Sequence, residues 1–489
     1  MTFHDRVHEL ADIRRFVQSS RPEMVIVYGR RGVGKSALLA EALQGSSYLF
    51  YQANTRSLPQ QLEDLTDAVQ VFAPDKILAG VLPSFDAFLD AVLLLARRAS
   101  PQPTVVVLDE LPYLALAEPA LPSVMQRWWD QLRRQNPPNL KVFLLGSLVS
   151  WMEQQTLSVT GPLHNRRTGQ VKLEAMAYAD AALFYPAYSP LEKVTAYSIW
   201  GGLPSYLAEL DPGRDLWSNV RESILVHSGR LADEPVWLRF ADLRTDLIYA
   251  SVLRAVATGS RRPAKIAAAV GKGRADEIMY HLDRLCELGL LERVVPIHER
   301  RAPRSKNALY RLADQYVAFW YRFVDRSRHM LAMRLYDQAL SGIQQQIDEY
   351  VGSHVFEGIC QQSLWRAFAS GHLPAGLAFE DTGAWWKGQN GGSDEIDVVA
   401  VDNGHAVLVG ECKWSSSPMD MRDLQGLRSA LAKASHDLDP IDHPWRALFS
   451  RSGFSDDLVA LARSPEERLL LFTPDDLYAP GIVEAVAGA

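Results

Sequence analysis

One glycine-rich segment near the N-terminus has the residues and spacing of a phosphate-binding loop. Residues 29–36 read Gly-Arg-Arg-Gly-Val-Gly-Lys-Ser, which fits the pattern G-x-x-x-x-G-K-[S/T]. An apolar run at residues 24–28 leads into the loop, and a helical pattern at residues 35–43 follows it. Glycines let backbone N–H groups surround phosphate oxygens, and the helix N-terminus adds its positive dipole. The residues expected at the phosphates are Gly29, Arg30, Arg31, Gly32, Val33, Gly34, Lys35, Ser36 and Ala37.

Two side chains of this loop and two later carboxylates have distinct expected roles. Lys35 is expected to reach the β- and γ-phosphates, and Ser36 to ligate Mg²⁺. Asp109 and Glu110 follow an apolar run at residues 105–108, at the strand end where open α/β sheets bind ligands. Asp109 would hold Mg²⁺ through water, and Glu110 would polarise the attacking water. The sequence therefore predicts hydrolysis of ATP with Mg²⁺ as the metal cofactor.

Three further residues could complete this nucleotide site. A strand-like run at residues 142–145 is soon followed by Ser147, whose hydroxyl could sense the γ-phosphate. Arg166 and Arg167 come soon after, and either could supply the positive charge that stabilises the transition state. The alternative interpretation of this pair is two solvated surface arginines.

A predicted hairpin near the C-terminus carries a second group of charged residues. Two strand-like runs, 395–401 and 406–414, flank Asp402-Asn-Gly404, a strong hairpin signal. Side chains two positions apart on a strand share a face, so Glu411 and Lys413 should project together. Charged residues in such apolar runs need a partner or a metal ion, because burying them alone is costly.

These residue types suit the hydrolysis of a phosphodiester. Asp397 and Glu411 are expected to bind one or two Mg²⁺ ions, and Glu357, from a helical pattern at residues 350–368, would complete the ligand set. Lys413 would orient or deprotonate the attacking water. The alternative is an ion pair between Glu411 and Lys413 on an amphipathic strand, which is common in proteins of any function.

Between these two regions the sequence predicts a winged helix-turn-helix. Helical patterns at residues 249–258, 263–270 and 274–288 precede strand-like runs at 290–295 and 308–312. This arrangement of basic residues would serve phosphate contacts and groove insertion on DNA. Docking of another protein is the alternative, because acidic residues dilute the charge of the third helix. The basic residues are Arg261, Arg262, Lys265, Lys272, Arg274, Arg300, Arg301, Arg304 and Lys306.

Taken together, these motifs resemble the archaeal-type P-loop ATPases, relatives of the AAA+ and STAND groups. The resemblance implies a central sheet of order 5-1-4-3-2 with a helical lid, and in some members a winged helix and a nuclease-like C-terminal domain. Such ATPases often assemble so that an arginine reaches a neighbour's nucleotide, which makes a homo-oligomer possible. The C-terminal Asp and Glu-x-Lys resemble the PD-(D/E)xK nuclease core. The remaining motifs behind the resemblance are Phe3-x-x-Arg6-x-x-Glu9-Leu10 and Gly201-Gly-Leu-Pro-Ser-Tyr-Leu207.

Length and composition are compatible with several domains. A chain of 489 residues exceeds one core and suggests about three domains. With 51 basic and 58 acidic residues, the formal net charge of −7 excludes a uniformly basic nucleic-acid coat but not one basic face. Three dispersed cysteines exclude a disulfide scaffold and fit the cytoplasm. No apolar run approaches the roughly 18 residues of a membrane-spanning helix, so no membrane partner is expected.

We therefore predict an α/β fold class with four domains. They are a P-loop ATPase core with a parallel sheet at residues 1–160, a helical lid at 161–245, a winged helix-turn-helix at 246–328, and an α/β restriction-endonuclease-like domain at 329–489. The expected function is ATP hydrolysis coupled to DNA, with a Mg²⁺-dependent nuclease-like C-terminal domain. The alternative is a nucleotide-dependent switch whose C-terminal domain only binds DNA or a partner.

Overall fold

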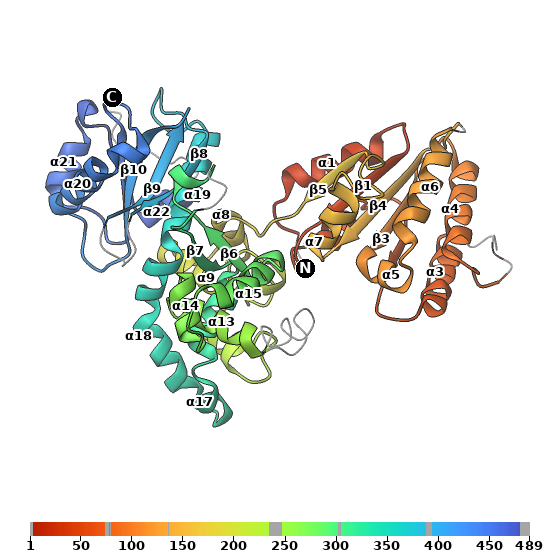
Figure 1. Ribbon diagram of the computed structural model, residues 1–489, viewed down its shortest axis with the longest axis horizontal. Helices are drawn as coiled ribbons and strands as arrows, with labels where there is room; N and C mark the ends of the chain where they lie inside the picture. Colours follow the sequence, from red (N-terminus) through yellow and green to blue (C-terminus); the bar gives the residue numbers. More distant parts are fainter. Residues whose placement is uncertain are drawn as a thin grey trace. The chain divides into compact units, whose positions relative to one another are not determined.

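The chain divides into two compact units (Figure 1). The first comprises residues 1–175 and 203–205, and the second residues 176–202 and 206–489. In the part of the chain that the structure describes, no helix has the length and apolar character needed to cross a membrane. The structure is a computed structural model that describes residues 3–73, 78, 80–134, 136–233, 247–301, 305–387 and 394–479.

A parallel five-stranded sheet forms the centre of the first unit. Its strand order is β2-β3-β4-β1-β5, so the predicted order 5-1-4-3-2 is confirmed. Nearly every residue of the three central strands is buried, as expected for β-branched runs covered on both faces. The strands are β1 (Glu23–Tyr28), β2 (Leu49–Gln52), β3 (Thr104–Asp109), β4 (Leu140–Gly146) and β5 (Gly169–Lys172).

The fifth strand extends the first unit beyond the predicted boundary at residue 160. Strand β5 pairs in parallel with β1, with Gly169 opposite Val25. A Cβ at Gly169 would lie 2.1 Å from the ring of Phe16, so glycine lets this edge strand pass under helix α1. Because β5 is short and only one of its residues is buried, no apolar run marks it in the sequence. Part of the predicted lid therefore belongs to the ATPase sheet.

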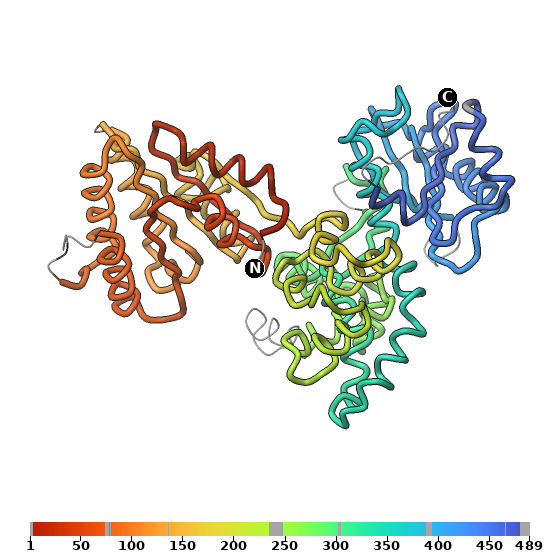
Figure 2. The backbone as a smooth tube through the Cα atoms, turned by 180° about the vertical axis from the view of Figure 1, so that it is seen from behind, coloured from red at the N-terminus to blue at the C-terminus, as the bar shows by residue number. Residues whose placement is uncertain are grey.

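Helices flank this sheet (Figure 2). Helix α1 packs against α2 and β5, while α4 packs against α3, α6 and β3. At the start of α4 the Ser84 hydroxyl accepts the backbone N–H of Ala87, and at the start of α3 the Gln60 side chain accepts the backbone N–H of Ser57. The helices are α1 (Val7–Gln18), α2 (Lys35–Ala42), α3 (Leu58–Phe72), α4 (Phe85–Ala99), α5 (Leu111–Ala117), α6 (Leu121–Arg134) and α7 (Val149–Met152), the last continued by a π-helical turn at Glu153–Leu157.

The second unit begins with helices and a small antiparallel strand pair. The three helices and two strands predicted between residues 249 and 312 are present, each within two residues of its predicted bounds. The strands are β6 (Leu291–Val294) and β7 (Leu309–Leu312). The helices are α8 (Tyr178–Ala181), α9 (Pro190–Trp200), α10 (Pro204–Leu207), α11 (Leu216–Val220), α13 (Leu247–Ala257), α14 (Pro263–Ala269), α15 (Asp276–Glu287), α16 (Gln315–Phe319), α17 (Arg328–Ala332) and α18 (Tyr336–His354).

A mixed five-stranded sheet completes the second unit, in the order β12-β11-β10-β9-β8. Strand β9 is antiparallel to both of its neighbours, β8 and β10, whereas β10, β11 and β12 are parallel. Helix α20 makes the crossover that the parallel pair β10 and β11 requires. The elements are α19 (Phe356–Ala369), β8 (Asp381–Trp386), β9 (Glu395–Asp402), β10 (His405–Lys413), α20 (Met421–Leu438), β11 (Trp445–Ser450), α21 (Asp456–Ala462), β12 (Leu469–Phe472) and α22 (Pro474–Tyr478).

The predicted helix at residues 350–368 is two helices in the structure. Helix α18 ends at His354 and α19 begins at Phe356, with Val355 between them at φ −128° and ψ −37°, outside the usual helical range. Glu357 consequently lies in the first turn of a new helix, instead of one-third of the way along a long one.

Candidate functional site

The phosphate loop joins β1 to α2 and depends on its glycines. Gly29, Gly32 and Gly34 have φ values of 155°, 83° and 96°, a backbone region that other residues rarely adopt. A Cβ at Gly29 would lie 2.3 Å from the carbonyl oxygen of Leu173, and one at Gly32 would lie 2.2 Å from the hydroxyl of Ser205. The loop therefore requires glycine for both its conformation and its close contacts.

Lys35, the first residue of α2, is a buried cation with neutral partners. Its ammonium donates to the carbonyl oxygens of Gly29 at 2.9 Å and Arg30 at 3.2 Å, and the residue is only 6% exposed. Burial lowers the pKa of Lys35, and the nearby charges of Glu110 and Asp109 partly oppose that shift. Phosphate oxygens would be stronger partners for this ammonium than carbonyls.

Ser36 and Asp109 bring together two hard oxygen donors. The Ser36 hydroxyl donates to the Asp109 carboxylate at 2.5 Å, which links the start of α2 to the end of β3. The other carboxylate oxygen of Asp109 accepts the backbone N–H of Glu110 at 2.9 Å. Hydroxyl and carboxylate oxygens are the ligands that Mg²⁺ prefers, so this donor set fits the ion.

Glu110 and Ser147 meet at the carboxyl ends of neighbouring strands. The Ser147 hydroxyl donates to the Glu110 carboxylate at 2.6 Å, and the Ser147 backbone N–H donates to the same oxygen at 3.2 Å. Glu110 has a left-handed backbone, with φ 54° and ψ 46°, which is uncommon for a residue with a side chain. Serine thus holds the predicted water-polarising carboxylate in place in this structure.

The structure gives both arginines of the predicted transition-state pair other partners. The Arg166 guanidinium makes two hydrogen bonds to the Asp130 carboxylate on α6, at 3.1 and 2.8 Å, and this pairing raises the pKa of Arg166. Arg167 donates to the carbonyl oxygens of Thr156 and His164, both at 2.8 Å. Sequence reasoning missed Asp130, because 36 residues separate it from its partner.

The C-terminal carboxylates lie on strands β9 and β10. The antiparallel register pairs Gly410 with Val398, and one step further along it brings Asp397 opposite Glu411, with their side chains on one face. One carboxylate oxygen of Asp397 accepts the backbone N–H of Cys412 at 2.8 Å, and the residue is 8% exposed. Helix α19 lies beside this pair, because the Gln361 amide donates to the Asp397 carbonyl oxygen at 2.9 Å.

The acidic side chains of this region raise one another's pKa values. Burial is the main cause that raises the pKa of Glu357, Asp397 and Glu411. The negative charge of Asp397 is the next cause for both glutamates, and the charge of Glu395 raises the pKa of Asp397. The carboxyls are therefore within electrostatic range of one another, with too little positive charge to balance them.

The predicted set of three metal ligands is not a ready-made cluster. Within the described residues, no group of three or more His, Cys, Asp or Glu side chains is arranged to hold a metal ion. The shared metal-binding role of Glu357, Asp397 and Glu411 stays a prediction, since each of the three has the charge of a neighbouring carboxyl among the causes that raise its pKa.

Lys413 has a partner that the sequence did not reveal. Its ammonium donates to the Asp423 carboxylate at 2.8 Å, in the first turn of α20, so the alternative ion pair with Glu411 is not the one observed. Asp423 also closes a capping box with Asp420. The pattern Asp-x-x-Asp at residues 420–423 was the available signal for a helix start, but not for this ion pair.

The basic residues of the predicted wing contact the C-terminal sheet. Arg300 pairs with Asp381, and Arg301 pairs with Glu380 at 3.4 Å. Between the wing strands, Ile297 is 6% exposed and belongs to the hydrophobic core of the C-terminal sheet. Arg304 lies outside the described residues. At the start of α15, by contrast, Arg274 is exposed and pairs with Asp276 at 3.0 Å.

Two family models match this chain. Residues 3–210 match an ATPase domain found predominantly in Archaea, in the region that contains the phosphate loop, Asp109 and Glu110. Residues 320–425 match a family described as archaeal and bacterial proteins of unknown function. Together with the geometry of the phosphate loop, the first match supports a P-loop ATPase domain in the N-terminal part of the chain.

One curated protein and two solved structures are similar to this chain. An uncharacterized protein of Methanocaldococcus jannaschii is 25% identical over 426 residues, which cover 86% of this chain and 88% of that protein. A Walker-type ATPase of Pyrococcus abyssi is 19% identical, with a TM-score of 0.49 over 65% of this chain and 96% of the other. The ORC2 protein of Aeropyrum pernix, solved with ADPNP and ADP, is 15% identical, with a TM-score of 0.40 over 68% and 96% of the two chains.

Proposed function

We propose that this P-loop ATPase acts on DNA and that its C-terminal domain cleaves phosphodiester bonds with Mg²⁺ under the control of ATP. The observation that carries the proposal is the placement of Asp397 opposite Glu411, with Lys413 two residues further along β10 and Glu357 on the preceding helix. The elements follow the order α19-β8-β9-β10-α20-β11, which resembles the PD-(D/E)xK core. Mixed sheets serve many functions, so the argument depends on the carboxylates and lysine they carry.

In the ATPase domain, the chain's own residues account for binding and for water activation. Lys35 would exchange its carbonyl partners for the β- and γ-phosphates. When bound through Ser36 and Asp109, Mg²⁺ supplies charge neutralisation on those phosphates. Glu110, held by Ser147, would accept a hydrogen bond from the attacking water and orient it in line.

In the C-terminal domain, the excess of buried carboxyl groups indicates that the site needs a cation. Buried carboxyls with raised pKa values bind either protons or a cation, so the donor chemistry of Asp397 and Glu411 fits Mg²⁺. The ion would supply charge neutralisation at a scissile phosphate. Lys413, on leaving Asp423, would orient the attacking water, and Glu357 would adjust the charge of the site from helix α19.

DNA binding is proposed for helices α13 to α15. Lys265 on α14 and Arg274 just before α15 are exposed, Lys272 between them is partly exposed, and Tyr280 on α15 is 71% exposed. Exposed basic and aromatic side chains of this kind support contact with phosphates and bases. A homo-oligomer remains a prediction, as does the role of Arg166 as an arginine finger.

A cleavage assay tests the proposal directly. Linear, supercoiled and branched DNA would be incubated with the full chain and Mg²⁺, with and without ATP, beside the Lys413→Ala variant. Cleavage that requires Mg²⁺ and Lys413, and that changes with ATP, is the expected result. Equal cleavage by the variant would remove the nuclease assignment while leaving the ATPase assignment intact.

A second function has one observation in its favour. Because the described carboxylates form no ready-made metal cluster and Lys413 pairs with Asp423, the C-terminal domain could bind DNA or a partner without cutting it. The chain would then be a nucleotide-dependent switch. A protein that shifts DNA in gels but never nicks it in Mg²⁺ or Mn²⁺ would identify this function.

A further inference from the structure

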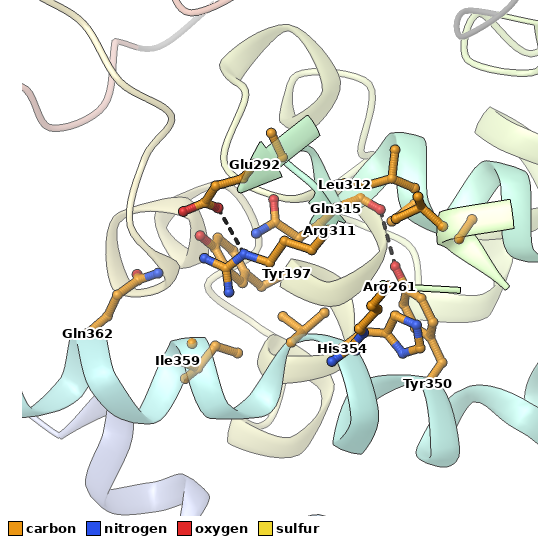
Figure 3. A pocket seen from close by; sticks show the side chains of 16 residues that line it. Tyr197, Arg261, Glu292, Arg311, Leu312, Gln315, Tyr350, His354, Ile359 and Gln362 are labelled. Atoms are coloured by element: carbon orange, nitrogen blue, oxygen red, sulfur yellow. Dashed lines mark hydrogen bonds and ion pairs between the residues drawn. The ribbon is translucent and has the colours of Figure 1, made fainter. Parts of the chain in front are cut away.

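A cavity of about 100 Å³ lies in the second unit beside the start of α19, where the charges of its residues Arg261 and Arg311 also act on Glu357 (Figure 3). Its walls come from hairpin β6–β7, from α16 and from the junction of α18 with α19. Because one water molecule needs about 10–15 Å³ of such space, the cavity has room for a phosphate group and its neighbouring atoms but not for a duplex. Its ligand is therefore small, or is the end of something larger.

Arg311 presents unused donors to this cavity. Its Nε donates to Glu292 at 2.8 Å across the β6–β7 pair, and both side chains are half exposed. A guanidinium has five N–H groups, and within the described residues the terminal nitrogens of Arg311 have no hydrogen-bond partner. Figure 3 shows this guanidinium at the centre of the cavity, above helix α19. Paired terminal nitrogens are suited to the oxygens of a phosphate.

The opposite wall contains Arg261 and an unsatisfied histidine. One terminal nitrogen of Arg261 donates to the carbonyl oxygen of Ser353. His354 is stacked on Tyr350, with 5.1 Å between ring centroids, and its Nε2 is buried without a hydrogen-bond partner among the described residues. Buried polar atoms are rarely left unpaired, so this nitrogen marks a place that a ligand atom or water completes.

The hydrogen bonds of Ser353 determine which ring nitrogen of His354 is a donor and which is an acceptor. The Ser353 hydroxyl donates its one proton to the Glu349 carbonyl oxygen at 2.7 Å, so Nδ1 of His354, 2.6 Å away, donates to that hydroxyl. Nε2 is then an acceptor, because burial and the charges of Arg261 and Arg322 lower the pKa of His354 and keep the ring neutral. The cavity therefore combines arginine donors with one acceptor.

We propose that this cavity binds a nucleoside monophosphate or the 5′-phosphorylated terminal nucleotide of a DNA strand. Arg261 and Arg311 contact the phosphate oxygens, and Nε2 of His354 accepts a hydrogen bond from a hydroxyl or amino group of the same nucleotide. Glu292 competes with the phosphate for Arg311 and is displaced on binding. The proposal does not depend on DNA cleavage, because binding requires no bond to break.

Binding is measured on the full chain by fluorescence anisotropy, in EDTA and without ATP. A single-stranded oligonucleotide with a 5′-phosphate should bind about tenfold more tightly than the same oligonucleotide with a 5′-hydroxyl. Competition by dAMP would identify a free nucleotide as the ligand, and its failure to compete would identify a strand end. Equal affinity for both oligonucleotides, together with no binding of dAMP, would overturn the proposal.

Substituting each partner of one ion pair in turn distinguishes a direct effect on ligand binding from damage to the fold. Arg311→Gln should weaken binding about tenfold, whereas Glu292→Gln should strengthen it severalfold, because the arginine loses its competitor. Both changes break the same half-exposed ion pair. If that pair only stabilised the fold, both variants would therefore bind more weakly. Arg127→Gln, which breaks an exposed ion pair with Asp86 in the first unit, is the matched control and should bind like the unmodified protein. Parallel losses in both variants would contradict the proposal.

Discussion

The two carboxylate-bearing sites of this chain differ in how their charges are balanced. At the phosphate loop, Asp109 accepts from Ser36 at 2.5 Å, and Glu110 accepts from Ser147 at 2.6 Å. At the C-terminal sheet, Glu357 and Glu411 have raised pKa values because they are buried near Asp397. The first site satisfies its acids with hydroxyl groups, whereas the second lacks enough positive charge.

This difference indicates two ways of preparing a site for phosphate chemistry. Hydroxyl donors fix the ATPase carboxylates before nucleotide arrives, so binding needs little rearrangement. The C-terminal carboxyls are costly to ionise until a cation arrives, so their charge state should respond to pH and metal. Substitutions can test each half of the comparison.

The largest effect is expected for Lys35→Ala at the phosphate loop. ATP turnover, measured as phosphate release, should fall by about 100- to 1000-fold, because the ammonium that neutralises the transferring phosphoryl group is removed. Lys172→Ala is the control, since this exposed lysine of the same unit pairs with Glu174 at 2.9 Å. If turnover survived the loss of Lys35, the assignment of the loop would be wrong.

The next effect is expected for Lys413→Ala. Mg²⁺-dependent DNA cleavage should fall by about 100-fold, because the positioned group that orients the attacking water is lost. Lys433→Ala is a matched control from neighbouring helix α20, where the lysine pairs with Asp394 on the surface. Equal losses in both variants would indicate general damage, and no loss in either would favour the binding switch.

A smaller effect is expected when Glu411→Gln removes one unbalanced carboxyl. Burial, followed by the charge of Asp397, raises the pKa of Glu411 to about 8. A raised pKa in the folded state means that this carboxyl destabilises the fold as pH rises from its ordinary range toward that value. The unmodified protein should therefore lose stability between about pH 5 and pH 8, and the variant should lose about 2 kcal/mol less.

Chemical denaturation at the two pH values measures this difference, with and without Mg²⁺. Added Mg²⁺ should restore stability at the higher pH in the unmodified protein and less so in the variant, because a bound cation balances the ionised acids. Glu466→Gln, an exposed glutamate of the same domain, is the control. A pH dependence identical in all three proteins would show that the acids of β9 and β10 are already compensated.

The smallest effect is expected for Arg166→Gln. Its pair with Asp130 is partly exposed, so urea denaturation should show a loss of less than about 1 kcal/mol. ATP turnover should stay within about twofold of the unmodified protein, because the guanidinium is already occupied by Asp130. A tenfold or larger fall in turnover at unchanged stability would instead support the arginine-finger role.

Local patterns account for what the sequence predicted well. The phosphate loop and the strand before Asp109 depend on neighbouring residues, and the structure places them as predicted. Strand β5 was missed because only one of its residues is buried, so it has no apolar run. The pairs Lys413–Asp423 and Arg166–Asp130 were missed because each joins a helix to another part of the fold, and no short pattern encodes that packing.

The loop between β6 and β7 also limits how the protein can be divided for experiments. Ile297 fills part of the C-terminal core, and the Trp386 indole donates to the Asn307 carbonyl oxygen at 3.0 Å. A fragment starting at residue 329 would lose this loop and expose the apolar surface it covers. Such a fragment should aggregate, whereas one that begins before α13 retains the loop and is the better choice for expression.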